Sequence, residues 1–276
     1  MVKVAIVKGG SPAAMVREAL RLINAEEVFS RDDKVLIKPN YVVASHPSTG
    51  ITTDTGVVEA LIKYFKEAGV KEIVVGEGGA GDTEKAFDVV GVRALCARER
   101  IRLVNLNRDD AITVRIPNAL SLKEVNIAKT VLESTCIVNV PVLKVHHLAF
   151  VTLCIKNLMG AIIPKSIMHT NLDEKLVDLA SVIKPKINLI SGIVGAEKDE
   201  TRGDPVEMGI IIAGRDIVAT DAVGAMVMGI DPYKVRYLRL AEERRLGVLD
   251  INRIEVVGES IEAVRKEFKL PPGFSR

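Results

Sequence analysis

A largely apolar stretch between positions 138 and 169 carries the residues most able to do chemistry. It contains His146, His147, His169, Lys144, Lys156 and Cys154. An unpaired buried ammonium is costly, so a lysine in such surroundings must reach water, an anion or a covalent partner. The stretch therefore predicts either a site for an anionic ligand or a reactive amine.

Cationic and amide side chains also follow other predicted elements. Lys38 and Asn40 come at the end of a predicted strand over 33–38, and Thr52 and Thr53 precede a predicted helix. Open α/β sheets bind ligands at the carboxyl ends of their strands, and helix starts favour anions. We expect a receptor for carboxylate or phosphate oxygens. Its predicted ligand-binding residues are Lys38, Asn40, Thr52, Thr53, Lys144, Asn157 and Asp221.

The candidate catalytic residues are Lys156, His146 and His169. A lysine beside an apolar wall has a depressed pKa, which suits a base, a nucleophile or a cofactor tether. The alternative is a lysine that extends from a helix end to water. His146 and His169 flank Lys156 and offer two imidazole nitrogens for part of a zinc, iron or nickel site. The alternative is that these histidines are hydrogen-bonded residues of the core or rim. For His147 that alternative is the favoured interpretation.

Asp221 lies in a predicted helix of small residues over 216–228. Its apolar neighbours favour a buried partner for one of the lysines, such as Lys156, over a surface carboxylate. Cys96, Cys136 and Cys154 form no CxxC pair, so a disulfide framework, a zinc ribbon or a cysteine-only iron–sulfur cluster is not expected. We expect all three to be core residues.

Composition narrows the class of protein. The chain has 276 residues, is 48% hydrophobic and carries a net charge of only +2. No long basic run occurs and aromatic residues make up 4%, so we expect no nucleic-acid or membrane-surface partner. No signal-peptide layout and no long apolar run is present, which predicts the reducing cytoplasm. A homo-oligomer stays open, and the content of Val, Ile, Glu, Lys and Arg resembles that of heat-adapted proteins.

The hydrophobic pattern predicts an α/β fold, a mainly parallel sheet flanked by helices on both faces. We expect one domain over 1–276, with a possible small lobe at about 95–135. Predicted strands cover 2–7, 33–38, 69–76, 101–105, 112–116, 136–143, 187–192, 208–213 and 253–257, and predicted helices cover 12–22, 57–68, 84–90, 149–163, 173–183, 216–228, 231–245 and 260–268. The charged loop at 199–205 has no predicted role. The glycine loop over 77–82 lacks the spacing of a dinucleotide or P-loop motif.

A set of motifs occurs in order along the chain: Val35–Asn40, Thr52-Thr53, Val138–His147, Thr152–Gly160, His169, Gly203–Gly209 and Ala219–Pro232. In this ordered set the chain resembles the domain of unknown function family 362, a prokaryotic group. The order of His146, Lys156 and His169 is also similar to a segment of the nickel-dependent lactate racemases. In that family a lysine tethers a pincer cofactor and a histidine binds nickel.

Two classes of function follow from these residues. The first is an enzyme that handles a small anionic substrate or cofactor in a cleft lined by lysine and histidine, with an unresolved reaction type. The racemase resemblance implies proton or hydride movement at a carbon next to a carboxylate if a metal is present. The second is a non-catalytic binding, carrier or maturation protein for a metal or an anionic cofactor.

Overall fold

A ten-stranded sheet forms the centre of the computed structural model, which describes residues 1–275. Its main path runs in the order β12 (Ile254–Gly258), β1 (Val2–Lys8), β11 (Asp204–Gly214), β10 (Ile187–Glu197), β7 (Cys136–Val140), β2 (Lys34–Pro39), β3 (Glu72–Glu77) and β4 (Arg102–Asn105). Beyond this path, β8 (Val142–His146) pairs with β10 and with β9 (Phe150–Thr152).

Most neighbouring strands of the sheet run parallel. The contiguous set β10, β7, β2, β3 and β4 is parallel throughout, whereas β1, β11 and β10 pair antiparallel. The parallel strands read as short runs of valine, isoleucine and leucine, which is the composition of strands covered on both faces. The predicted fold class, an α/β protein with a mainly parallel sheet, is confirmed.

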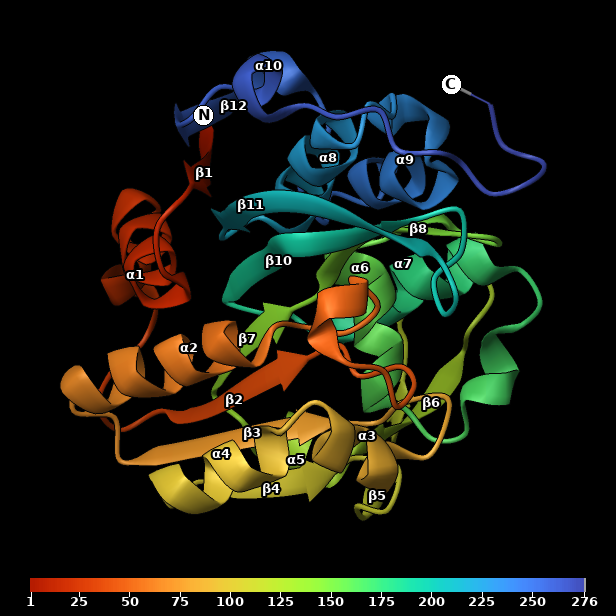
Figure 1. Ribbon diagram of the computed structural model, residues 1–276. Helices are drawn as coiled ribbons and strands as arrows, with labels where there is room; N and C mark the ends of the chain where they lie inside the picture. Colours follow the sequence, from red (N-terminus) through yellow and green to blue (C-terminus); the bar gives the residue numbers. More distant parts are fainter. Residues whose placement is uncertain (276) are drawn as a thin grey trace.

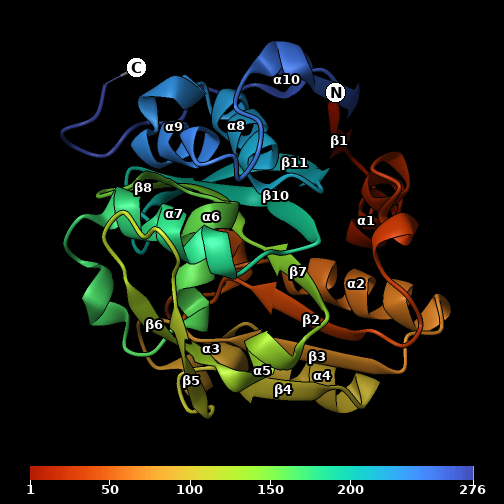
Figure 2. The ribbon, with the colours of Figure 1, turned by 180° about the vertical axis from the view of Figure 1, so that it is seen from behind.

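Helices cover both faces of this sheet (Figures 1 and 2). One face carries α1 (Pro12–Leu22), α2 (Thr55–Glu67), α3 (Thr83–Val89) and α4 (Val92–Glu99). The other carries α5 (Lys129–Glu133), α6 (Cys154–Asn157), α7 (Leu172–Val182), α8 (Ile217–Val227), α9 (Arg236–Glu243) and α10 (Ile261–Val264). The apolar side chains form two core clusters, one on each face.

Local sequence signals account for several element boundaries. The Ser11 hydroxyl accepts a hydrogen bond from the Ala14 amide and Pro12 opens α1, which ends at Leu22 as predicted. In α2 the Asp54 carboxylate accepts from the amides of Gly56 and Val57. This side chain occupies the donors that were expected to favour a bound anion at that helix start.

The predicted helix over 149–163 is wrong. The segment forms β9, the short helix α6 and a 3₁₀ turn, η3 (Leu158–Ala161). Nearly all residues of this segment are buried or half-buried. No exposed face therefore marks a helical or a strand period, and the apolar pattern cannot distinguish the two. The predicted strand over 136–143 is also two strands, because Pro141 separates β7 from β8. Lys144 and His146 therefore lie within β8, not beyond a strand end.

Other boundaries were misplaced near the carboxyl half. The predicted helix over 260–268 stops at Val264, and the helix over 231–245 divides into η5 (Pro232–Lys234) and α9. The strands β10 and β11 extend into the charged loop, so only residues 198–203 separate them. Within the predicted lobe at 95–135, β4 joins the main sheet, while β5 (Ala111–Arg115) and β6 (Glu124–Ala128) form a separate two-stranded sheet. The division into domains stays a prediction.

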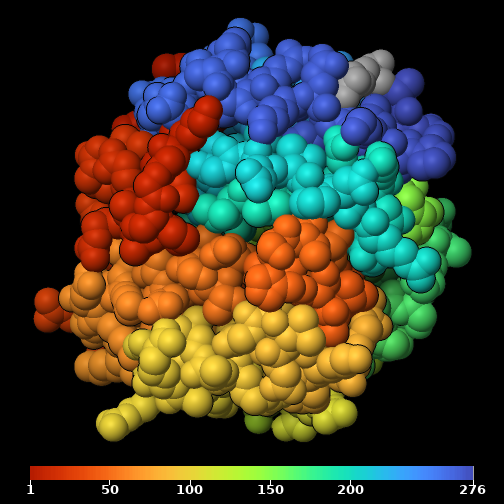
Figure 3. Space-filling view, viewed as in Figure 1, coloured from red at the N-terminus to blue at the C-terminus, as the bar shows by residue number. Residues whose placement is uncertain are grey.

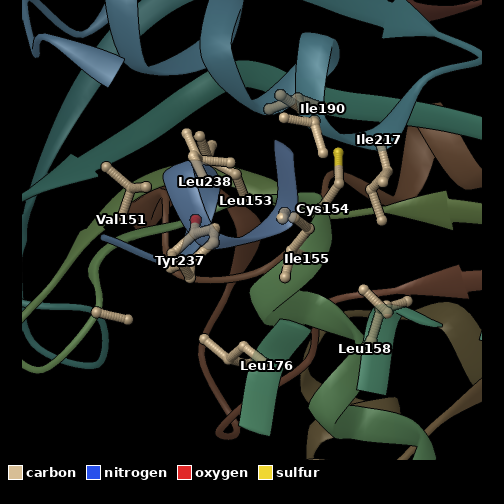
Figure 4. Packing of buried hydrophobic residues seen from close by; sticks show 14 of the residues in the cluster. Val151, Leu153, Cys154, Ile155, Leu158, Leu176, Ile190, Ile217, Tyr237 and Leu238 are labelled. Carbon is tan, nitrogen blue, oxygen red and sulfur yellow. The ribbon is translucent and has the colours of Figure 1, made fainter. Parts of the chain in front are cut away.

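The short helix α6 sits inside the core and is held at its start by α8. Cys154 and Ile155 pack among leucine and isoleucine side chains (Figure 4). The Asp221 carboxylate accepts hydrogen bonds from the amides of Cys154, at 2.6 Å, and Ile155, at 3.0 Å. Asp221 therefore caps α6 and is not the expected partner of the Lys156 ammonium.

Replacing Asp221 by alanine should destabilise the protein. Two buried amides would lose their acceptor, and one such loss costs about 1–3 kcal/mol. We expect Asp221→Ala to lower the free energy of unfolding by at least that amount in urea denaturation. The exposed Asp32, which pairs with Lys71 at the surface, provides the control, and Asp32→Ala should have a much smaller effect. Equal effects for the two variants would contradict the capping role.

Candidate functional site

A small pocket opens where the carboxyl ends of β2 and β3 meet β8, β9 and α6. Its volume is about 80 Å³. The lining residues are Asn40, Val42, Glu77, Gly78, Gly79, Ala80, Lys144, His146, Thr152, Lys156, Asn157, Met159, Gly160, Lys165 and Glu200. The segment with η2 (Pro47–Thr49) lies beside the turn between β10 and β11, orange next to cyan in Figures 1 and 3. Side chains from distant parts of the sequence thus share one pocket.

Lys38 is neutralised by a carboxylate at the floor of the site. Its Nζ donates to Glu77 Oε2 and, at 3.3 Å, to the carbonyl of Pro39. Both side chains are almost fully buried. Burial lowers the pKa of Lys38, while the Glu77 charge opposes this shift. Lys38 therefore contributes to a buried ion pair and not directly to ligand binding.

Lys144 uses all three of its N–H bonds within the protein. Its Nζ donates to Asn40 Oδ1 at 2.9 Å, to the Ile51 carbonyl at 2.7 Å and to the Glu200 carbonyl at 3.1 Å. All three acceptors are neutral, so no directly bonded carboxylate cancels the charge. Burial lowers the pKa of Lys144 to about 7. Lys144 therefore raises the electrostatic potential of the pocket without offering a free donor.

A chain of buried amides holds Lys144 in place. Asn40 Nδ2 donates to Asn157 Oδ1 at 2.8 Å, and Asn157 Nδ2 donates to Asn139 Oδ1 at 2.8 Å. Asn139 Nδ2 donates to Asn188 Oδ1 at 3.2 Å, which leaves Asn188 Nδ2 without a partner in the described chain. Each amide in the series has its orientation set by the preceding donor. Asn40 and Asn157 line the pocket, but their side-chain oxygens and nitrogens already make hydrogen bonds within this network.

Two polar groups at the pocket lack partners. Within residues 1–275, Lys156 Nζ makes no hydrogen bond and no ion pair, and Thr152 Oγ1 is buried without a hydrogen-bond partner. Burial lowers the pKa of Lys156 to about 8, against a partial opposing effect of the Glu200 charge. Buried polar groups are normally paired, so the Thr152 hydroxyl points to a missing partner, and the half-buried Lys156 amine in the same lining offers a donor to the same group.

The charges around the pocket do not balance. Three lysines, Lys144, Lys156 and Lys165, and two carboxylates, Glu77 and Glu200, are in the lining, and Glu77 is already paired with Lys38. Lys165 donates to Asn107 Oδ1 and to the Ile162 carbonyl, and burial lowers its pKa to about 8. A pocket with more ammonium groups than carboxylates favours an anion.

His146 presents one ring nitrogen to the backbone and the other to the pocket. Its Nδ1 accepts hydrogen bonds from the amides of Leu148, at 3.0 Å, and Ala149, at 3.3 Å. Burial, together with the nearby lysines Lys156 and Lys144, lowers the pKa of His146 to about 2. The imidazole is therefore neutral in the physiological pH range.

Two histidines lie next to Glu200, in a group of the kind that can hold a metal. His146, His147 and Glu200 each offer a ligand atom, and these atoms lie within 4.8 Å of one another. His147 Nδ1 is already 2.6 Å from Glu200 Oε1. The lone pair of His146 Nδ1 is taken by backbone amides, so Nε2 carries the proton of the neutral ring. These residues do not fit a divalent metal in this arrangement.

Five of the predicted site residues do not line the pocket, and one of them is Lys38, described above. Thr52 Oγ1 donates to the Ser45 carbonyl, and Thr53 Oγ1 donates to the Val140 carbonyl. Asp221 caps α6, and His169 is exposed outside the pocket lining. The predicted metal pair of His146 and His169 is therefore not brought together at this pocket.

The predicted set also lacked several residues that the pocket contains. Glu77 is the last residue of β3 and the first of the glycine loop over 77–82. Glu200 lies in the charged loop at 199–205. Thr152 and Lys165 complete the missed set. A glutamate directly after a buried strand was a usable signal, because it marks a strand end where ligands bind. The sequence offered no comparable signal for Thr152.

The chain matches the family described as domain of unknown function 362 over residues 35–226, more than half of its length. The chain belongs to this family. The family match spans β2 through most of α8 and so contains every residue that lines the pocket.

Two individual proteins resemble this family member. It is 26% identical over 252 residues to thylakoid-associated protein sll1697 of Synechocystis, covering 87% of this chain and 77% of that protein. Its structure resembles the lactate racemase apoprotein of Thermoanaerobacterium thermosaccharolyticum, with a TM-score of 0.40 and 16% identity over 78% of this chain. The match spans only 54% of that racemase. Among the described residues, no helix is long and apolar enough to cross a membrane.

Gly160 should be sensitive to a single added methyl group. A Cβ there would lie 2.4 Å from Glu77 Oε1 and 2.5 Å from Lys38 Nζ, so the ion pair would have to move. We expect Gly160→Ala to lower the free energy of unfolding by about 1–3 kcal/mol. Gly81 is the matched control, because its Cβ would make only ordinary contacts from 3.5 Å outward. Gly81→Ala should stay within about 0.5 kcal/mol of wild type, and a similar loss for both variants would contradict the account.

Proposed function

We propose that this protein binds a small carboxylate or phosphate in the pocket and that Lys156 moves a proton to or from it. The observation that carries the proposal is the Lys156 amine, which borders the pocket without a hydrogen-bond partner among the described residues. Beside it lies the unpaired hydroxyl of Thr152. An anion oxygen would satisfy both donors.

Charge supports an anionic ligand over a neutral one. The Lys144 ammonium is bonded to three neutral acceptors, so its field in the pocket is not cancelled at close range. A bound anion interacts favourably with Lys144 and Lys156 together, in surroundings where charges are weakly screened. The pocket volume of about 80 Å³ restricts the ligand to a few heavy atoms.

The Lys156 amine also suits acid–base chemistry. Its pKa of about 8 leaves a useful fraction of neutral amine near physiological pH, whereas an ordinary lysine is almost entirely protonated. The neutral amine can take a proton from a carbon next to a carboxylate, and the resulting ammonium can return it. In that step the C–H electron pair forms a carbon–carbon double bond and the carbonyl π pair moves onto oxygen, whose negative charge the nearby lysines stabilise.

A non-catalytic carrier would use the same groups for affinity alone, and it is the competing function. Incubating the protein with short-chain carboxylates in D2O separates the two. Exchange at the carbon next to the carboxylate, followed by NMR, supports catalysis, while binding without exchange supports a carrier.

A cytoplasmic location, the absence of a nucleic-acid partner and a homo-oligomeric state stay predictions.

Removing the Lys156 amine should weaken anion binding. We expect Lys156→Met to weaken oxalate binding by about tenfold to a hundredfold, because a hydrogen bond to a charged group is lost. Isothermal titration calorimetry measures the affinity directly. Lys85 is exposed on α3, outside the pocket lining, so Lys85→Met should bind oxalate like wild type. Unchanged affinity in Lys156→Met would refute the proposed site.

Oxalate affinity should also fall as the pH rises. Burial holds the pKa of Lys144 at about 7 and that of Lys156 at about 8, so both lysines are charged below this range and neutral above it. An anion favours the charged forms, so binding takes up protons. Above these values the affinity should decrease by about tenfold per pH unit for each proton taken up. Calorimetry at constant ionic strength checks this, and an affinity independent of pH would contradict it.

A further inference from the structure

We infer that His146 acts in this pocket as a neutral hydrogen-bond donor, through its Nε2–H group, and neither as a metal ligand nor as a general base. The inference rests on the proposed function, because the group that accepts this hydrogen bond is an oxygen of the bound anion. A histidine at this position was expected to bind a metal or to act in catalysis, whereas the hydrogen bonds around His146 make it a donor to the ligand.

Hydrogen bonding at the other ring nitrogen fixes the tautomer. A neutral imidazole has one nitrogen that carries a proton and one that carries a lone pair. The backbone amides of Leu148 and Ala149 can only donate, and both point at His146 Nδ1. Nδ1 must therefore hold the lone pair. The proton sits on Nε2, the nitrogen that faces Glu200 Oε1 across 3.9 Å.

The hydrogen bonds at His146 Nδ1 run in the opposite direction to those at the second ring nitrogen of a metal-binding histidine. A histidine that binds a metal through one nitrogen usually donates the other N–H to a carboxylate, a carbonyl or water. His146 instead accepts at that second position, from two amides held in the turn after β8. Binding a metal at Nε2 would require loss of the only ring proton.

The strands place His146 in the same pocket lining as Thr152 and Lys156. In the antiparallel β8–β9 pair, Lys144 lies opposite Thr152, and His146 lies two residues beyond Lys144 on the same face. Lys156 follows from α6, one short segment after β9. Because 3.9 Å is too long for a hydrogen bond to Glu200, the donor stays available to a ligand.

Three donors on one side of the pocket define the ligand class more narrowly. The neutral Lys156 amine, the Thr152 hydroxyl and the His146 imidazole N–H suit a short carboxylate whose oxygen gains negative charge during reaction. When Lys156 removes a proton from the adjacent carbon, the C–H bond breaks, and its electron pair forms the carbon–carbon double bond of an enolate. The new charge on oxygen then accepts the Nε2–H hydrogen bond. Reversal of the step returns the proton to carbon.

The tautomer can be measured on the wild-type protein without any ligand. Long-range proton–nitrogen correlation spectra of uniformly ¹⁵N-labelled protein separate a protonated Nε2 from a protonated Nδ1. We expect His146 to show a protonated Nε2 and an unprotonated Nδ1, unchanged on addition of equimolar nickel or zinc. A proton on Nδ1, or loss of the Nε2 proton on adding either metal, would overturn the inference while leaving the anion pocket possible.

A pair of substitutions tests the donor role. Glutamine places an amide N–H near the original Nε2 and cannot serve as a general base, whereas alanine removes the donor. We expect His146→Gln to bind oxalate within about threefold of wild type and His146→Ala to bind about tenfold to a hundredfold more weakly. The exposed His46, outside the pocket lining, provides the control His46→Gln, which should bind normally.

The outcomes separate the inference from the proposed function. Equal losses of affinity in the glutamine and alanine variants would overturn the donor role, provided that circular dichroism shows both variants folded. If either variant is unfolded, the tautomer measurement decides alone. Failure of the wild-type protein to bind oxalate, sulfate or phosphate would refute the proposed function even with the expected tautomer.

Discussion

Burial of ammonium groups without matching carboxylates is the constraint on which this structure depends. Desolvation disfavours the charged form, as the pKa of about 7 for Lys144 shows. Three neutral oxygens held at 2.7 to 3.1 Å offset part of this cost. Those oxygens come from three separate segments, so the charge can be accommodated only when β2, η2 and the β10–β11 turn are all in place.

The network of asparagine side chains connects the position of Lys144 to that of α6 and β7. Lys144 fixes Asn40, which fixes Asn157 on α6, and Asn139 on β7 continues the series. Asp221 fixes α6 from the opposite end by accepting its first amides. The short helix is thus held by a polar side chain at each end, and the position of Lys156 follows from both attachments. A helix of four residues would have little stability of its own.

The sequence was sufficient for the fold but only in part for the site. Covered strands and capped helices such as α1 follow from apolar runs and from Ser11-Pro12, which act locally. Lys38 lies at the carboxyl end of β2, as the strand-end rule predicts, whereas Lys144 lies within β8 and Lys156 on α6. In contrast, apolar periodicity could not reveal that 149–163 contains a strand. The capping contact of Asp221 joins residues 66 and 67 positions apart, which no local pattern encodes.

The direction of hydrogen bonds separates residues that merely line the pocket from those able to bind a ligand. Asparagine, histidine and lysine are all polar candidates by residue type, but Lys144 has no donor left for a ligand. His146 has one, because two backbone amides take its acceptor nitrogen and leave its N–H facing the pocket. Specificity therefore passes to the donors that the fold leaves unpaired, and an oxygen acceptor with negative charge is the partner that satisfies them together.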